Sequence, residues 1–279
     1  MTAILMDGRA LARDLKQQLK IHASRFRSEH GILPALALVL AGRHPTARIY
    51  GSHVERSCAE IGLQCITYTF PADISESEFR DAVAQLNDAP TVRGVVVLLP
   101  LPGHIQQRRV TEVIAPEKDV DGLGPRNAGK LMLGFPSFMP STAAVVRMLL
   151  NHYQIPVCGQ HAVVVGRSNV GGKPIALELL RAEATVTICH SRTPDLATIT
   201  RTADILVVSI GQPRAIRGDM IKPGAVVLDA GINAVNGQIV GDVDRASVEQ
   251  VAAYLTPVPG GIGPLTNLML ISHVLKGPS

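Results

Sequence analysis

At 279 residues, the chain is long enough for two ordinary domains, each with its own hydrophobic core. Hydrophobic residues make up 46% of it and aromatic residues only 3%, so the core must be aliphatic, as in α/β proteins with buried parallel strands. The net charge of +4 comes without a basic run or interleaved aromatics, which argues against a nucleic-acid surface and favours small anionic ligands.

The four cysteines (Cys58, Cys65, Cys158 and Cys189) lie far apart and form neither a CxxC pair nor a Cys/His pattern of metal ligands. We therefore expect reduced structural thiols in a cytoplasmic protein, and no metal site. The N-terminus lacks the basic and apolar segments of a secretory signal, and no apolar run approaches the ~18 residues of a membrane span. The sequence thus predicts a protein that is neither secreted nor inserted in a membrane.

Strands and helices alternate through the first half of the chain. Leu11, Leu15 and Leu19 recur at helical spacing, which predicts a helix over residues 9–30 that stops at Gly31. The next predicted elements are a strand at 35–40, a helix from 45 to about 60, a strand at 64–70, a helix to about 87 behind the capping box of Ser75 and Glu78, and a strand at 94–99. This order predicts a first βαβ region.

A charged loop without periodicity, APEKDVDGLG, covers residues 115–124. Loops at the carboxyl ends of parallel strands hold ligands, so the carboxylates of this loop are candidate binding groups. A helix capped at Ser141 and Thr142 follows and runs to about Tyr153. We place the domain boundary just before it, near Pro140.

The stretch 161–180 contains a short β-branched strand, a glycine turn and a helix with a proline in its first turn. This is the pattern of the first βα unit in a doubly wound nucleotide-binding sheet. Gly166, Ser168 and Gly171 follow the G-x-G-x-x-G spacing, with serine at the second glycine. The free backbone N–H groups at the helix start are expected to face an anion.

The residues after the next strand, at 184–189, favour NADP over NAD. A site selective for NAD places an acidic residue roughly 20 residues after the glycine turn, and none is present here. Ser191 and Arg192, with Arg167 in the turn, instead offer a hydroxyl and two guanidiniums that suit a 2′-phosphate. Solvated surface arginines are the simpler alternative, but their joint position at two turns that face a dinucleotide predicts NADP.

The rest of the chain continues the alternation. Strands are predicted at 203–209 and 225–229, followed by Gly211 and Gly231, where a backbone must come close to another group. A short helix is predicted after 241–244, and a rigid loop, PVPGGIGP, precedes a last apolar helix. We expect that helix to pack back on the first domain.

Six motifs together resemble the methylenetetrahydrofolate dehydrogenase/cyclohydrolase family of the FolD type, nearly end to end. They are Tyr50, LPLP at 99–102, KDVDG at 118–122, GRSNVGGKP at 166–174, DAGIN at 229–233 and PVPGGIGP at 257–264. The resemblance implies an α/β fold with two domains. Residues 1–139 plus 264–279 would form an αβα folate-binding catalytic domain, and residues 140–263 a Rossmann-type NADP-binding domain with a parallel sheet. It also implies a homodimer that holds a one-carbon derivative of tetrahydrofolate between the domains.

The resemblance further implies roles for individual residues. Tyr50 would orient the pterin, and Asp121 would accept hydrogen bonds from two of its N–H groups, a task that suits a carboxylate. The substrate-binding residues would be Tyr50, Val54, Leu98, Asp121, Gly260, Gly261 and Thr266. The cofactor-binding residues would be Gly166, Arg167, Ser168, Ser191, Arg192, Gly211 and Ile232.

The chain departs from the family pattern at two partnered positions. The resemblance implies a catalytic lysine four residues after the tyrosine, where this chain has Val54, and a glutamine before LPLP, where it has Leu98. Both have become apolar. Residues 140–143, Pro-Ser-Thr-Ala, also depart from the usual Pro-Cys-Thr-Pro.

The loss of the lysine affects the two family reactions differently. Hydration of the methenyl bridge needs general acid–base help worth about 10²–10⁴-fold, which valine cannot give. Hydride transfer mainly needs the two rings to be held in the right geometry. We therefore expect NADP-dependent oxidation of 5,10-methylenetetrahydrofolate in one-carbon metabolism, with the cyclohydrolase activity lost or impaired.

Three alternatives remain open. The enzyme is bifunctional if another group, such as His53, replaces the lysine. It is a folate-binding pseudoenzyme if both ligands bind without turnover. A different NADP oxidoreductase, resembling shikimate dehydrogenases, is the third, but that architecture needs a lysine that the matching helix lacks.

Overall fold

The computed structural model describes residues 2–278, which divide into two compact units. The first, which we call the six-stranded unit, holds the chain up to Ala12 together with Thr142–Thr266. The second, the three-stranded unit, holds Arg13–Ser141 together with the chain from Asn267 onward. Both are α/β structures with parallel sheets, so the predicted fold class is confirmed.

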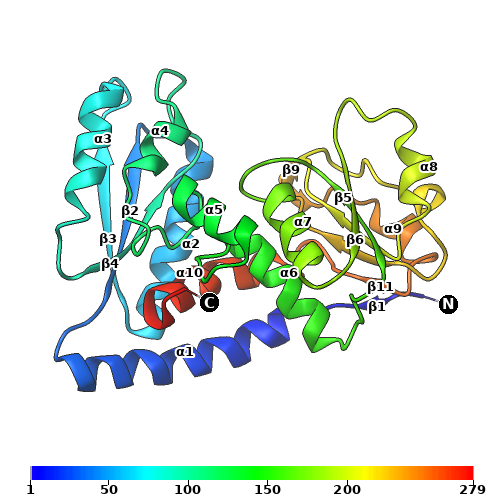
Figure 1. The fold of residues 1–279 in the computed structure, drawn as a ribbon, viewed down its shortest axis with the longest axis horizontal. Helices are drawn as coiled ribbons and strands as arrows, with labels where there is room; N and C mark the ends of the chain where they lie inside the picture. Colours follow the sequence, from blue (N-terminus) through cyan, green and yellow to red (C-terminus); the bar gives the residue numbers. More distant parts are fainter. Residues whose placement is uncertain (1, 279) are drawn as a thin grey trace. The chain divides into compact units, whose positions relative to one another are not determined.

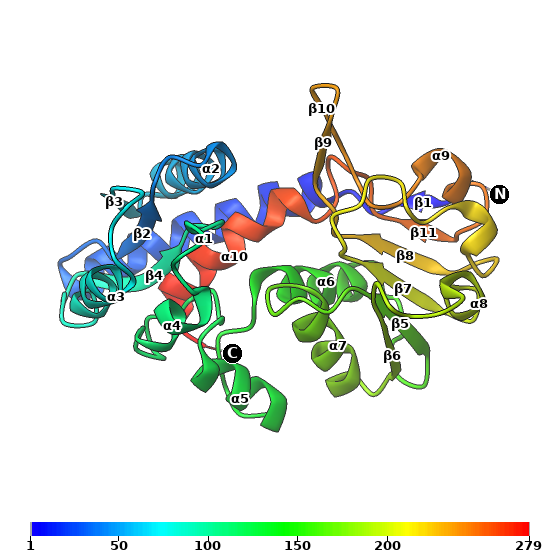
Figure 2. The same cartoon turned by 90° about the horizontal axis from the view of Figure 1, so that it is seen from above.

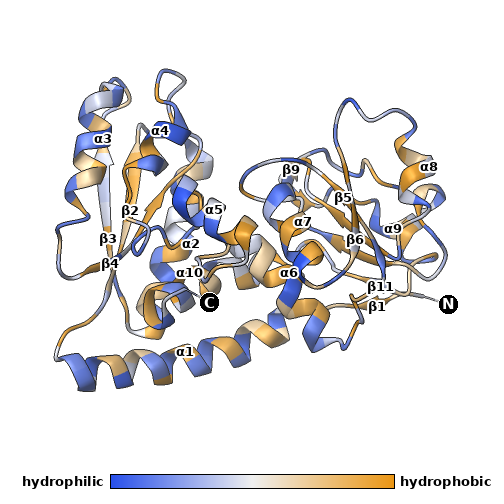
Figure 3. Cartoon of the chain, viewed as in Figure 1, coloured by the Kyte–Doolittle hydropathy of each residue, from blue (hydrophilic) through white to orange (hydrophobic). Residues whose placement is uncertain are grey.

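The three-stranded unit is built on β2 (Ala35–Ala41), which pairs in parallel with β3 (Gln64–Phe70) and β4 (Val92–Val97). Every residue of β2 is buried, and the strand is orange along its length in Figure 3. A strand buried on both faces reads as a continuous apolar run, which is why the sequence predicted it well. One core cluster packs β2 and β4 against Phe79 and Val83.

The helices of this unit include α2 (Pro45–Ile61), α3 (Glu76–Gln85), α4 (Gln107–Glu112) and α5 (Pro125–Leu133). Two further helices, α1 (Gly8–His30) and α10 (Gly263–Lys276), contribute the parts from Arg13 and from Asn267 onward. The predicted capping box opens α3: the Ser75 hydroxyl accepts from the backbone of Glu78, and the Glu78 carboxylate accepts from the backbone of Ser75.

The six-stranded unit carries its strands in the order β1-β11-β8-β7-β5-β6, all parallel (Figures 1 and 2). Their bounds are β1 Ile4–Leu5, β5 His161–Val165, β6 Thr185–Cys189, β7 Ile205–Val208, β8 Val226–Asp229 and β11 Tyr254–Leu255. A hairpin of β9 (Asn233–Val235) and β10 (Gln238–Val240) follows β8. Figure 2 shows α6 (Ser141–His152) and α7 (Gly172–Arg181) on one face of the sheet, with α8 (Leu196–Thr200) and α9 (Arg245–Val248) on the other.

The units differ from the predicted domains at the start of the chain. Ile4 and Leu5 pair with Tyr254 and Leu255, which places residues 2–12 in the six-stranded unit rather than with residues 13–139. A strand of two residues leaves no periodic pattern from which it could be predicted. The second break falls after Ser141, near Pro140, and the last helix belongs to the three-stranded unit from Asn267 on.

Candidate active site

The six-stranded sheet has a topological switch point between β5 and β7. The chain leaves β5 for β6 on one side and returns to β7 on the other, so the turns after β5 and β7 diverge. Ligands of doubly wound sheets bind at such a point, outside the carboxyl ends of the strands. Gly166 and Gly211, both predicted to bind the cofactor, follow these two strands.

Gly166 is required by the close approach of the two turns. Its φ of +135° is open to glycine, and a Cβ there would lie 2.3 Å from the carbonyl oxygen of Ser209. The Gly166 N–H donates to Cys189 and the Ser209 N–H to Val165, so backbone bonds fix both turns to the sheet. The glycine therefore brings the turn onto β7 and leaves its outer side open.

The outer side of the turn presents free donors. Within residues 2–278, no hydrogen bond is donated by the backbone N–H of Arg167, Ser168, Asn169 or Val170, and all four residues are exposed. The Ser168 hydroxyl accepts from the N–H of Gly171 at 3.1 Å, which shapes the turn from inside. A loop with unpartnered N–H groups at a helix start is an anion-binding feature, so the residues present fit a pyrophosphate.

Three exposed side chains predicted to contact the 2′-phosphate are free to do so. Arg167, Ser191 and Arg192 are all exposed, and neither arginine takes part in an ion pair within the described part of the chain. The Arg192 backbone N–H lies 3.2 Å from His190 Nδ1, which ties the turn after β6 to its own strand end. The donor set of this edge fits NADP.

Two buried aspartates outside the predicted set of site residues, Asp229 and Asp242, shape the turns after β7 and β8. Asp229 accepts from the backbone of Gly231, Asp242 and Val243 at 2.9–3.0 Å. Asp242 accepts from Ile210 at 2.7 Å and Gly211 at 2.9 Å. Burial raises the pKa of Asp229 to about 6, although the hydrogen bonds from the backbone act to lower it. The signal available in the sequence was an aspartate inside each glycine-rich turn.

The same network positions two predicted cofactor contacts. Gly211 is held by Asp242, and Ile232 follows Gly231, whose N–H is held by Asp229. Ile232 remains 67% exposed although it is a large apolar side chain. An exposed isoleucine on a rigid turn beside the switch point is free to pack on a flat ring.

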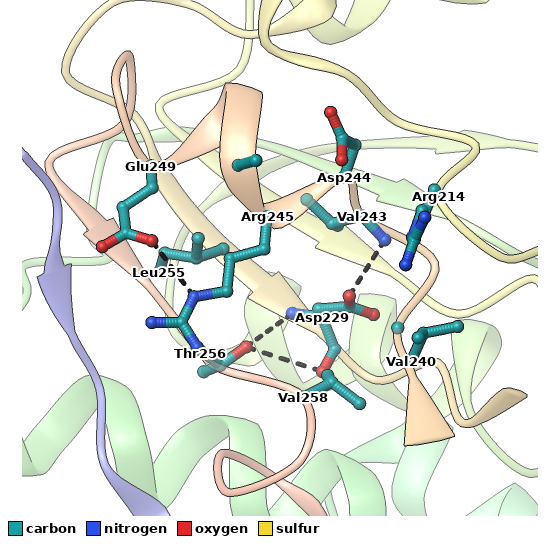
Figure 4. Close-up of a pocket in the computed structure, with 12 residues that line it drawn as sticks. Arg214, Asp229, Val240, Val243, Asp244, Arg245, Glu249, Leu255, Thr256 and Val258 are labelled. Atoms are coloured by element: carbon teal, nitrogen blue, oxygen red, sulfur yellow. Dashed lines mark hydrogen bonds and ion pairs between the residues drawn. The ribbon is translucent and has the colours of Figure 1, made fainter. Parts of the chain in front are cut away.

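A cavity of about 470 Å³ lies beside the end of β8, and no predicted site residue lines it (Figure 4). Asp229, Thr256, Arg214 and Arg245 are among its lining residues. The Asp229 carboxylate is already held by backbone donors, and Arg245 pairs with Glu249 at 3.1 Å. Because the Asp229 and Arg245 side chains are already bonded within the chain and no predicted site residue lines the cavity, it does not match the predicted chemistry.

The glycines of the PVPGGIGP loop make room for the chain itself. A Cβ on Gly260 would lie 3.1 Å from the guanidinium of Arg9, and one on Gly261 would lie 2.7 Å from Thr256 Cβ. The Thr266 hydroxyl donates to the Gly263 carbonyl at 3.0 Å. The predicted role of these three residues in substrate binding stays a prediction, and packing within the six-stranded unit accounts for both glycines.

Tyr50 and Asp121 are neighbours in the three-stranded unit. Tyr50 lies on α2, Asp121 in the loop before α5, and both are half-buried. The pKa of the Tyr50 hydroxyl is raised mainly by burial and to a lesser degree by the charge of the Asp121 carboxyl. The pKa of Asp121 is raised to about 7, mainly by burial and to a lesser degree by the charge of the nearby Asp119 carboxyl. Within residues 2–278, no protein group hydrogen-bonds the Asp121 carboxyl, so both of its oxygens are available to a ligand.

Val54 and Leu98 are buried in the same unit, with 0% and 1% of their surface exposed. Val54 belongs to the buried stripe of α2 with Gly51 and Cys58, and Leu98 donates its N–H to Val39 at 2.9 Å. A Cβ on Gly51 would lie 2.9 Å from Leu98 Cδ1, so Leu98 packs directly on α2. Both positions are parts of an aliphatic core.

His53, the predicted substitute for the lysine, is exposed, whereas Val54 beside it is buried. Adjacent helical positions lie about 100° apart around the axis, which separates the imidazole from the buried face. The structure thus gives no support to a rescue by His53.

The same structure can be examined for disulfides, metal ligands and membrane-spanning helices. The four cysteines are unpaired. In the described part of the chain, no three His, Cys, Asp or Glu side chains are grouped to hold a metal ion. Among the helices within residues 2–278, none combines the length and the apolar character needed to cross a bilayer.

Two family models match the chain in sequence. The catalytic-domain model of tetrahydrofolate dehydrogenase/cyclohydrolase matches residues 6–121, and the NAD(P)-binding-domain model of the same family matches residues 140–278. The bifunctional protein FolD of Geobacillus thermodenitrificans is 47% identical over 277 residues, which cover 99% of this chain and 97% of that protein.

Solved structures agree with these matches. The bifunctional FolD methylenetetrahydrofolate dehydrogenase/cyclohydrolase of Campylobacter jejuni is 40% identical, with a TM-score of 0.96 and coverage of 99% of this chain and 98% of that one. The Trypanosoma brucei methylenetetrahydrofolate dehydrogenase-cyclohydrolase, complexed with NADP cofactor and inhibitor, is 35% identical, with a TM-score of 0.94 and coverage of 99% and 97%.

Proposed function

Because the chain belongs to the tetrahydrofolate dehydrogenase/cyclohydrolase family, we propose that it oxidises 5,10-methylenetetrahydrofolate to 5,10-methenyltetrahydrofolate with NADP, and that its cyclohydrolase activity is lost or impaired. The observation that carries the second part is the burial of Val54 and Leu98, where the resemblance implies a lysine and a glutamine. A buried aliphatic pair can neither take nor give the protons that hydration of the methenyl bridge requires.

The cofactor is NADP. Its pyrophosphate would bind the free N–H groups of residues 167–170, and its 2′-phosphate would bind Arg167, Ser191 and Arg192. When bound, NADP⁺ supplies the two-electron oxidation by accepting a hydride from the methylene carbon, which leaves the methenyl cation. Ile232 and the turn at Gly211 would hold the nicotinamide end, because the Asp229 and Asp242 network fixes both.

The substrate would bind through Tyr50 and Asp121, with Gly260, Gly261 and Thr266 as further contacts. Val54 and Leu98, both buried, would contribute through the packing of the helix that carries Tyr50. The free Asp121 carboxyl can accept two N–H groups of the pterin edge, which orients the ring. The Tyr50 side chain, half-buried beside it, offers a flat face for stacking. Because Val54 is uncharged, it does not repel the cation that forms on oxidation, as a lysine at this position would.

A spectrophotometric experiment tests both parts. Purified protein with methylenetetrahydrofolate and NADP should form NADPH and the methenyl product in equal amounts. A second assay starts from methenyltetrahydrofolate and follows its hydrolysis, which should stay near the uncatalysed rate. No oxidation with either nicotinamide coenzyme, despite binding of both ligands, would instead support a folate-binding pseudoenzyme.

A bifunctional enzyme is the second candidate, because the relatives at 40% and 47% identity are named as such. In that case Asp121 is a candidate base, since its carboxyl has no hydrogen-bonding partner within residues 2–278 and its pKa is about 7. Measurable hydrolysis that is abolished by Asp121→Asn but not by the control Asp88→Asn, at an exposed aspartate outside the predicted site, would favour it.

The proposal extends to the assembly and its compartment. We propose a homodimer in the cytoplasm that binds neither nucleic acid nor membrane. The four unpaired cysteines support a reducing compartment. Light scattering on the purified chain, at a mass of 29.7 kDa per protomer, distinguishes the dimer from a monomer.

A further inference from the structure

His273 lies in the buried part of α10 and is linked to the loop that carries Asp121. Its Nδ1 lies 2.7 Å from the carbonyl oxygen of Val120, although 153 positions separate the two residues in the sequence. His273 is 6% exposed and Val120 is fully buried. Since a carbonyl oxygen only accepts, the proton of this bond resides on Nδ1.

The surroundings of the bond keep the imidazole neutral and oriented. Burial lowers the pKa of His273, with the bond to Val120 acting in the opposite direction. Its ring packs on the Phe138 ring at a centroid distance of 5.4 Å. The imidazole thus has one N–H, and the geometry directs it to the backbone of residue 120.

The segment on the other side of Asp121 is also held. The Gly122 N–H donates to the Asp119 carbonyl at 2.9 Å, and a Cβ on Gly122 would lie 2.2 Å from the Phe138 carbonyl. The Asp119 carboxylate accepts from the N–H of Gly124 and from Asn127 Nδ2, at 2.8 and 2.9 Å. Asp121 is therefore flanked by fixed backbone on both sides while its own carboxyl stays free.

We propose that His273 is a positioning residue for the folate: its Nδ1–H anchors the Val120 carbonyl and so fixes the direction in which the Asp121 carboxyl meets the pterin. This inference rests on the proposed function of Asp121. A carboxylate that accepts two N–H groups must be held to within a few tenths of an ångström, and a buried tether one residue away supplies that constraint.

The test compares His273→Leu with His273→Asn. Leucine has a side chain of similar size but no N–H, so it leaves the Val120 carbonyl without this donor, whereas asparagine keeps an N–H close to the position of Nδ1. We expect His273→Leu to raise the KM for methylenetetrahydrofolate by about tenfold and to leave the KM for NADP unchanged. His273→Asn should restore the native KM.

Leu270→Ala is the matched control, because Leu270 is also fully buried on α10 and has no bond to the loop. It should lower the thermal stability without changing the KM for the folate. A native folate KM in His273→Leu, or an equal rise in Leu270→Ala, would overturn the proposal.

Two further measurements test the role of His273 if the leucine variant does not fold or if the native protein has no dehydrogenase activity. If His273→Leu fails to fold, ¹⁵N NMR of the imidazoles in the native protein reads the tautomer of His273 directly. A ring protonated at Nε2 alone would refute the bond on which the proposal rests. If the native protein has no dehydrogenase activity, calorimetric titration with tetrahydrofolate tests the tether separately, since weaker binding to His273→Leu than to the native protein needs no turnover.

Discussion

Leu98 packs on helix α2 at Gly51, with its Cδ1 atom 2.9 Å from the point where a Cβ of residue 51 would stand. Val54 lies one turn further along the same buried stripe. The two positions that the family resemblance assigns to a charged lysine and its amide partner therefore belong to one aliphatic contact region. Apolar residues at both positions allow this interior to be closely packed. A polar residue at only one of the two positions would be buried without a partner.

The pair Val54 and Leu98 can be tested by restoring the polar residues. Val54→Lys alone places an ammonium at a fully buried position and should lower the free energy of unfolding by about 2 kcal/mol or more. Val54→Lys with Leu98→Gln should recover part of that loss and raise the rate of methenyltetrahydrofolate hydrolysis by about 10²-fold. Urea denaturation and the hydrolysis assay measure the two effects. No gain in hydrolysis would indicate that other parts of the site have also changed.

Gly94 and Gly129 offer a matched pair of alanine substitutions. A Cβ on Gly94 would lie 2.8–2.9 Å from the methyl groups of Val120 and Val274, so Gly94→Ala should cost about 1–3 kcal/mol by overpacking. Gly129 lies inside α5, and within residues 2–278 no atom beyond its own stretch of helix lies within 4 Å of its Cβ position, so Gly129→Ala should gain about 0.5–1 kcal/mol. Thermal unfolding of both variants checks the opposite signs. Equal effects would contradict the close packing described at β4.

The affinity for the folate should depend on pH through Asp121. Its pKa of about 7 leaves the carboxyl protonated in acid, where it can no longer accept two N–H groups. The KM for methylenetetrahydrofolate should therefore fall as the pH rises through about 7, and Asp121→Asn should flatten this profile. A KM independent of pH in the native enzyme would argue against a role for the carboxylate.

The same carboxyl should also make stability depend on pH. Because the folded state raises its pKa, its stabilising contribution is complete below the unfolded value near 4 and is lost as the pH rises to about 7. Asp121→Asn should gain stability relative to the native chain over that window. Urea unfolding at both ends of the window measures the difference, and a constant difference would mean that the carboxyl is ionised throughout.

Selectivity for NADP should reside in the exposed arginines. Arg192→Ala should raise the KM for NADP by about tenfold and leave the KM for NAD unchanged, because only NADP carries the 2′-phosphate. Arg181→Ala, an exposed arginine at the end of α7, is the control and should change neither value. A parallel loss with both coenzymes would place Arg192 elsewhere than at the 2′-phosphate.

The sequence was most informative where one local pattern decides the structure. The apolar run of β2, the capping box at Ser75 and the glycine turn after β5 were each predictable within a residue or two. It was least informative where two distant segments meet. The two-residue strand β1 exists only because it pairs with β11, and the Asp229 and Asp242 carboxylates are explained only by the turns they join. His273 carries no local signal for its contact with Val120, since 153 positions separate them.

The parallel pairing of β1 with β11 has a consequence for synthesis of the chain. The edge of the six-stranded sheet is completed by Ile4 and Leu5, whose partners Tyr254 and Leu255 follow 250 positions later in the sequence. Strands β2 to β4 come from one continuous stretch and can pair early. Ile4 and Leu5 thus stay without their strand partner during synthesis until β11 has been made.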